Sequence, residues 1–226
     1  MIRNVKILKL MGIKPRTVIH VGAHFGQDQS EYEALGVEKV FWCEADEDCI
    51  AIIREKYPSS STIHGVFWSE AHKTIDFWFM KDSAQNSAFR PREKSQSLTK
   101  ETRRTTTLDE EFMALNLKKP IMLVLDVQGA EIEVLKGGKE LLSNIKYLVC
   151  EITNKSSISN FSVLQKDVEI ILDQYGFSST ISRPSYNNEY LDLLMIRDGI
   201  FARLRIFIID YLFKYMKRIL RMPKNA

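Results

Sequence analysis

Two glycines and a glutamate near the start of the chain have residue types and spacing that suit nucleoside binding. Gly22 and Gly26 lie in the turn after the apolar run at residues 17–21, and Glu44 ends a second apolar run that begins at Val40. This order predicts a strand, a tight turn, a helix and a second strand, and such a turn brings backbone N–H groups close to a ligand. A carboxylate at the end of the second strand can accept hydrogen bonds from both hydroxyls of a ribose. The residues of this unit predicted to bind a cofactor are Gly22, Ala23, His24, Gly26, Glu44 and Ala45.

The spacing of the glycines separates two classes of cofactor. Dinucleotide enzymes use G-x-G-x-x-G, whose glycines admit a pyrophosphate. Here the spacing is G-x-x-x-G, and His24 occupies the place of the middle glycine. Its side chain would obstruct a pyrophosphate, which favours a nucleoside without phosphate, such as S-adenosylmethionine. A turn with a purely structural role also uses glycine, so these residues alone leave that interpretation open.

Two further carboxylates follow apolar runs later in the chain. Asp126 comes directly after residues 121–125, and Glu151 comes directly after residues 147–150. Ligands of open α/β sheets bind beyond the carboxyl ends of the strands, so we expect both carboxylates and Glu44 to face one crevice. For each carboxylate taken alone, an ordinary helix cap or a surface acid is an equally good interpretation.

Alternating strand and helix patterns predict the elements that must position these residues. Strands are predicted at residues 17–21, 40–44, 62–68, 74–80, 121–125, 147–151, 177–182 and 189–197. Helices are predicted at residues 2–12, 27–35, 47–56, 110–117, 131–136 and 161–175. Asp46 and Asp109 are the expected N-caps of two of these helices. The last two strands should pair as an antiparallel hairpin, and the whole pattern predicts a doubly wound α/β sheet in one domain at residues 1–199.

Composition limits the class of protein further. The chain has 226 residues, 45% of them hydrophobic, and a net charge of +3, which is too small to indicate general binding of nucleic acid. Its three cysteines are scattered, with no C-x-x-C motif, which indicates a reducing compartment. Lysines interrupt the basic N-terminus, which is therefore a poor signal peptide. We expect a cytoplasmic protein.

Beyond these local patterns, residues 17–197 resemble the FkbM-type methyltransferases. The segment VIHVGAHFGQ is similar to the family's cofactor loop, FWCEAD to its second strand with the ribose carboxylate, and TTTLDEEF to its T-L-D segment. The most specific similarity is LVLDVQGAEIEVLKGG followed by YLVCEI, and YLDLLMIR resembles the closing strand. His20 stands where the family usually has aspartate, which implies an altered contact to the methionine end of the cofactor.

The resemblance implies a fold and an activity. The fold is the Rossmann-like class I methyltransferase fold: a seven-stranded, mostly parallel sheet with an antiparallel last strand and helices on both faces. The implied activity is S-adenosylmethionine-dependent O-methyl transfer to a hydroxyl of a sugar, a glycan or a related small metabolite. One alternative is a nicotinamide-dependent oxidoreductase, which the missing middle glycine disfavours. The other is a binding protein that has lost catalysis, which the departure at His20 keeps open.

Methyl transfer to a neutral hydroxyl needs a general base within hydrogen-bond reach. Asp126 is the first choice for this base, or for a carboxylate that positions the acceptor, and Glu151 is the second. His20 and His24 are alternative bases, because imidazole titrates near neutral pH. A metal site at the two histidines is disfavoured, since no third ligand lies nearby in the sequence.

Three more side chains are assigned to the cofactor. His20 is expected near its methionine end, and Phe67 and Trp68 are expected to flank the adenine. Packing in the core explains either aromatic residue equally well.

Two basic segments stand apart from these elements. Residues 81–105 carry seven lysines and arginines, and we expect either a solvated loop or a lid that favours anionic acceptors. Residues 200–226 are predicted to form a basic amphipathic helix, too interrupted by charges to span a membrane. This helix is expected to pack on the domain, to form a homodimer interface or to lie on an anionic membrane surface. The expected partners are otherwise a small-molecule or glycan acceptor, and no nucleic acid.

Overall fold

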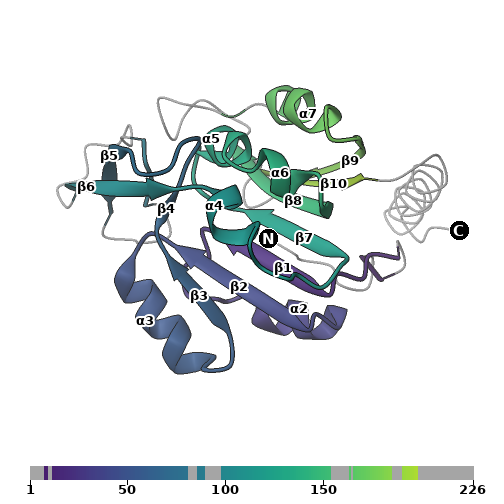
Figure 1. Ribbon diagram of the computed structural model, residues 1–226, viewed down its shortest axis with the longest axis horizontal. Helices are drawn as coiled ribbons and strands as arrows, with labels where there is room; N and C mark the ends of the chain where they lie inside the picture. Colours follow the sequence, from purple (N-terminus) through teal and green to yellow (C-terminus); the bar gives the residue numbers. More distant parts are fainter. Residues whose placement is uncertain are drawn as a thin grey trace, which may run out of the picture.

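A computed structural model describes residues 8–9, 12–80, 86–89, 98–153, 163, 165–184 and 190–197 of the chain. Seven strands form the main sheet, in the order β3-β2-β1-β7-β8-β10-β9 (Figure 1). These strands are β1 (Thr17–Val21), β2 (Lys39–Glu44), β3 (Ser61–His64), β7 (Ile121–Leu125), β8 (Ile145–Thr153), β9 (Phe177–Pro184) and β10 (Tyr190–Arg197). The helices are α2 (Gln29–Leu35), α3 (Glu47–Lys56), α4 (Leu108–Phe112), α5 (Glu131–Lys136), α6 (Lys139–Leu142) and α7 (Gln165–Asp173).

Strand directions confirm the predicted fold class. The neighbours from β3 to β8 pair in parallel, whereas β10 runs antiparallel to both β8 and β9. The predicted hairpin of the last two strands is therefore present. All five residues of β1 and all five of β7 are buried, as expected for central strands of a parallel sheet that is covered on both faces.

Two hydrophobic clusters show that helices cover both faces of the sheet. Ile19 of β1 belongs to one cluster, together with apolar residues of α4, α5, α6 and α7. Val18 belongs to the other cluster, together with residues of α2 and α3. Successive side chains of a strand point to opposite faces, so β1 contributes to both cores.

A small second sheet was not predicted. Its order is β4-β6-β5, and it is built from β4 (Val66–Phe67), β5 (Thr74–Phe79) and β6 (Thr99–Thr106). The predicted strand at residues 62–68 is in fact two strands in different sheets, with Gly65 between β3 and β4. Residues 99–106, assigned to the basic loop from sequence, form β6, which pairs antiparallel with β5.

Two of the three described basic residues of this segment pair with acids. Lys100 lies 2.7 Å from Asp76 on β5, and Arg103 lies 2.8 Å from Glu101. The pairing of Lys100 could not be predicted from local spacing, because Asp76 comes from another strand. The lysines and arginines at positions 81, 90, 92 and 94 lie outside the described residues.

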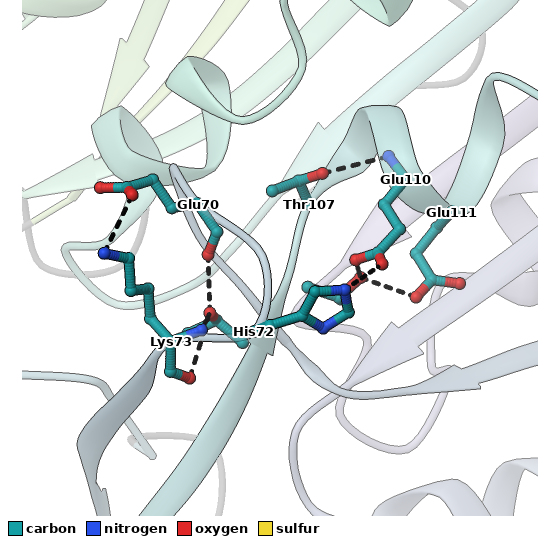
Figure 2. Close-up of polar contacts among 8 residues, drawn as sticks. Glu70, His72, Lys73, Thr107, Glu110 and Glu111 are labelled. Atoms are coloured by element: carbon teal, nitrogen blue, oxygen red, sulfur yellow. Dashed lines mark hydrogen bonds and ion pairs between the residues drawn. The ribbon is translucent and has the colours of Figure 1, made fainter.

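Polar contacts fix the small sheet to α4 (Figure 2). His72, in the turn before β5, places its Nε2 atom 2.8 Å from the Oε1 atom of Glu110 on α4. The Thr106 hydroxyl at the end of β6 donates to the other carboxylate oxygen of Glu110 at 2.8 Å. The Thr105 hydroxyl donates to the backbone oxygen of Glu70 at 2.6 Å. The turn and β6 are thereby held beside the main domain.

Of the two predicted N-caps, one is correct and one is wrong. Asp46 caps α3, since its side chain accepts hydrogen bonds from two backbone N–H groups of that helix. Thr107, rather than Asp109, caps α4. The Asp109 carboxylate instead accepts from the backbone N–H groups of Glu140 and Leu141 in the first turn of α6. Sequence spacing does not reveal such a cap supplied by a distant segment.

Most residues at both ends of the chain lie outside the described ranges. Within the predicted helix at residues 2–12, only residues 8–9 are described as helical, and the predicted helix at residues 200–226 lies wholly outside the described residues. In the described part of the chain, no helix is long and apolar enough to cross a membrane.

Candidate active site

A pocket opens at the carboxyl ends of β1, β2 and β7, where the sequence predicted a crevice. The empty space between its lining residues is about 650 Å³, which includes open solvent. The small sheet forms its far wall through Phe77 of β5, and Asn86 and Ala88 lie beside that strand. The described residues that line the pocket are Val21, Gly22, His24, Gln27, Cys43, Glu44, Ala45, Gly65, Val66, Phe67, Phe77, Asn86, Ala88, Asp126, Val127, Gln128 and Ala130.

Gly22 allows the turn after β1 to approach the end of β7. Its φ angle is +81°, and a Cβ atom at this position would lie 1.8 Å from the backbone oxygen of Asp126. No side chain fits at such a distance, so the turn requires glycine for both conformation and space. Ala23 and Gly26 shape the same loop through the hydrogen bond from the Gly26 N–H to the Ala23 oxygen, without lining the pocket themselves.

Glu44 holds the cofactor loop together, a role that the sequence did not reveal. Its carboxylate accepts hydrogen bonds from the backbone N–H groups of His24 at 2.8 Å, Ala45 at 2.7 Å and Asp46 at 3.0 Å. Burial raises the pKa of the carboxyl, and the three hydrogen bonds oppose that rise. A carboxylate offers about four acceptor positions, so one remains for a donor in the pocket.

Asp126 directly follows β7, and Glu151 lies beside it within β8, two residues before the end of that strand rather than at its end as the sequence predicted. Leu125 pairs with Cys150 in the sheet, so Asp126 and Glu151, which come next in the sequence, lie side by side. The Gln128 side-chain amide donates to Asp126 Oδ1 at 2.7 Å and reaches Glu151 Oε2 at 3.5 Å. Asp126 and Gln128 line the pocket, whereas Glu151 lies behind them.

The two carboxyls hold their protons unusually tightly. Burial raises the pKa of Asp126 to about 6, and the hydrogen bond from Gln128 opposes that rise. Burial raises the pKa of Glu151 to about 8, helped by the negative charges of Asp126 and Asp192. Asp192 faces Glu151 across the β8–β10 pair. The pair therefore contains a carboxylate that can exchange a proton near neutral pH.

Glu131 ties down the turn between β7 and α5. Its Oε1 atom accepts from the backbone N–H groups of Gly129 at 3.1 Å and Val127 at 3.3 Å. Burial raises the pKa of this carboxyl to about 7. From the sequence, Glu131 was only the first residue of the predicted helix at residues 131–136, and neither its contacts nor the role of Gln128 was predicted.

His20 lies outside the pocket, on the sheet face that α2 and α3 cover. The imidazole is 2% exposed, its Nδ1 atom lies 2.9 Å from the Tyr32 hydroxyl, and its ring packs 5.4 Å from the Trp42 ring. Burial lowers the pKa of His20 to about 4, so the imidazole is neutral at physiological pH. The expected side-chain contact with a cofactor and the role as a base do not fit this position.

Of the remaining predicted residues, three line the pocket and one does not. His24, Ala45 and Phe67 line the pocket, but Trp68 does not, since its ring packs 5.8 Å from that of Phe89. Phe77, which the sequence did not single out, lines the pocket instead. Among the described residues, no group of three or more histidine, cysteine, aspartate or glutamate side chains is arranged to hold a metal ion.

The sheet order and the single antiparallel strand define an α/β protein with the Rossmann-like fold of class I methyltransferases. The model of the methyltransferase FkbM domain matches residues 20–179, which is most of the chain. The chain belongs to the FkbM methyltransferase family, and it is an S-adenosylmethionine-dependent methyltransferase.

The chain is also similar to solved structures, at low sequence identity. One is a TehB-like SAM-dependent methyltransferase from Corynebacterium glutamicum, with a TM-score of 0.46 and 11% identity over 86% of this chain and 87% of that one. Another is magnesium protoporphyrin IX methyltransferase from Synechocystis, with a TM-score of 0.46 and 12% identity over 86% and 80%. A third is TrmK from M. capricolum, with a TM-score of 0.46 and 9% identity over 97% and 88%. A comparison with curated proteins returns no match.

Proposed function

We propose that this enzyme transfers the methyl group of S-adenosylmethionine to a hydroxyl of a sugar, a glycan or a related small metabolite. The observation that carries the proposal is the Asp126–Glu151 pair, which borders the pocket with raised pKa values. A neutral hydroxyl must lose its proton as it attacks, and a carboxyl with a pKa near neutrality is suited to accept that proton.

The pocket suggests how the cofactor is held. Glu44 has an acceptor position left for a ribose hydroxyl, and Phe67 and Phe77 supply apolar surface for the adenine. The turn at Gly22 closely approaches Asp126, so a cofactor held by this turn would have its methionine end near Asp126. Because His20 is neutral and lies outside the pocket, this end must be recognised by other groups, such as the backbone of the turn.

The sulfonium of the bound cofactor supplies an electrophilic methyl group. In the proposed transfer the acceptor oxygen would form a bond to the methyl carbon as the carbon–sulfur bond broke, and the sulfur would keep the electron pair. Asp126, the carboxylate of the pair that lines the pocket, takes the hydroxyl proton. Alignment of the reacting atoms can contribute several kcal/mol, so Asp126 also acts by orienting the acceptor.

The choice of acceptor can be tested with matched sugars. We expect neutral sugars to be methylated at least about tenfold faster than sugars that differ only by a carboxylate or phosphate, since an anion beside two carboxyls is destabilised. Two basic residues of β6, Lys100 and Arg103, already pair with acids and do not offset this repulsion. Transfer of a radiolabelled methyl group at low salt measures the ratio. Equal or faster transfer to the anionic sugars would support the lid that favours anions instead.

Binding of the cofactor product tests the role of Glu44. Glu44→Gln should weaken binding of S-adenosylhomocysteine by about 1.5–3 kcal/mol, because a carboxylate acceptor is lost and an N–H group is turned toward N–H donors. Calorimetry measures the affinity, and NAD serves as the ligand that should not bind. Asp48→Asn, an exposed change on α3, is the control. A folded Glu44→Gln variant with wild-type affinity would remove Glu44 from the ribose site.

A further inference from the structure

Residues 86–89 lie along the rim of the pocket, against the outer side of the small sheet. The backbone N–H of Ser87 donates to the Trp78 oxygen at 3.0 Å, and the Trp78 N–H donates to the Ser87 oxygen at 2.8 Å. This pair of hydrogen bonds attaches the segment to β5 as an isolated bridge. Asn86 and Ala88 line the pocket on either side of Ser87. The segment and β5 together form one wall, which we call the roof.

Asn86 connects the roof to the Glu44 side of the pocket. Its Nδ2 atom donates to Asp46 Oδ2 at 2.9 Å, and its Oδ1 atom accepts from the Met80 N–H at 2.9 Å. Asp46 is the N-cap of α3, and its own backbone N–H donates to Glu44 Oε1. The side chain of Asn86 therefore joins the end of β5 to Asp46, whose backbone N–H is bonded to Glu44, the carboxylate proposed to bind the ribose.

Ser87 connects the roof to the Asp126 side of the pocket. Its hydroxyl donates to the backbone oxygen of Gln128 at 2.9 Å and accepts from the Phe89 N–H at 3.0 Å. Ser87 is buried, with 4% of its surface exposed. The side chain of Gln128 in turn donates to Asp126. Since β2 and β7 flank β1 in the sheet, the two links reach opposite sides of the cofactor turn.

We propose that Asn86 and Ser87 are positioning residues that clasp the roof to both sides of the cofactor pocket. Neither residue needs to touch the reacting atoms. With both links made, the roof holds Phe77 against the pocket and keeps Glu44 and Asp126 at a fixed separation. The clasp thus retains the bound cofactor and sets the geometry of transfer. This inference rests on the proposed function, because it assumes that the cofactor occupies this pocket.

The release rate of S-adenosylhomocysteine tests the clasp without any knowledge of the acceptor. Ser87→Ala removes the hydrogen bond to the Gln128 oxygen, together with the one from the Phe89 N–H, and should speed release about tenfold at every pH. Asn86→Asp places a carboxyl against the carboxylate of Asp46 and should speed release about 10- to 100-fold at pH 8. At pH 5 the new carboxyl can carry a proton and donate it to Asp46. The ratio of the variant's rate to the wild-type rate should therefore fall toward one.

The pH dependence of that ratio separates positioning from general damage to the fold, which would not be repaired by protonation of one side chain. Stopped-flow fluorescence measures release, and Ser143→Ala, an exposed serine change after α6, is the matched control. Wild-type release rates in both variants would overturn the clasp, and so would a ratio for Asn86→Asp that does not change with pH. If the wild-type protein fails to bind S-adenosylhomocysteine at all, the proposed function fails instead.

Discussion

Replacing Asp126 by asparagine is expected to lower the turnover of methyl transfer by about 10²–10⁴-fold, the usual contribution of a general base. The amide keeps the size of the side chain and the oxygen that accepts from Gln128. It cannot take a proton from the acceptor hydroxyl. The affinity for S-adenosylhomocysteine should change much less, because Asp126 acts mainly in the transition state.

The pH profile gives a second signature of the same residue. Wild-type turnover should rise with pH through about 6, where Asp126 loses its proton, because only the charged form is a base. Between about 6 and about 8 the pair keeps one proton, held on Glu151. The rise near pH 6 should be absent from the residual activity of Asp126→Asn. Glu151→Ala should move the rise to higher pH, because it removes the hydrogen bond by which protonated Glu151 lowers the pKa of Asp126.

Steady-state kinetics of Asp126→Asn, with an acceptor that the wild-type enzyme methylates, measure both effects. Asp173→Asn, an exposed change at the end of α7, is the control and should match the wild type. Near-normal turnover of Asp126→Asn would exclude Asp126 as the base. His24, which also lines the pocket, would then be the next residue to replace.

The main sheet could be predicted because its signals are local. The continuous apolar run at residues 121–125 marks β7, and Asp126 directly follows that strand by position alone. Asp46 caps the helix that begins at the next residue. In each case the residue and its partner are close in sequence, so spacing carries the information.

The parts that could not be predicted depend on contacts between distant segments. Strand β6 is polar and basic, and only pairing with β5, more than 20 residues earlier, makes it a strand. Asp109 caps a helix 30 residues further on. The face on which His20 lies follows from the alternation along β1, but the Tyr32 hydroxyl that accommodates its ring nitrogen comes from α2. Propensity and periodicity do not encode such partners.

Replacing Gly22 by alanine is expected to abolish cofactor binding and to destabilise the fold by about 3 kcal/mol or more. The Cβ atom would lie 1.8 Å from the backbone oxygen of Asp126, so either the turn after β1 or the end of β7 must move. Either movement increases the distance between the turn, which is proposed to hold the cofactor, and the carboxylate of Asp126. For a domain of this size the loss corresponds to a fall of about 6–12 °C in Tm.

Gly36→Ala is the matched control. Gly36 ends α2 with a φ angle of +79°, almost the same as the +81° of Gly22, but nothing lies within 4 Å of a Cβ atom there. Alanine at position 36 therefore carries only the cost of the left-handed conformation, about 1–2 kcal/mol. Thermal unfolding and calorimetry with S-adenosylhomocysteine compare the two variants. Equal losses of stability, with binding kept in both, would show that the close approach at Gly22 has no role beyond its φ angle. A larger loss confined to Gly22→Ala, with cofactor binding gone, would show that the contact between β1 and β7 builds the site.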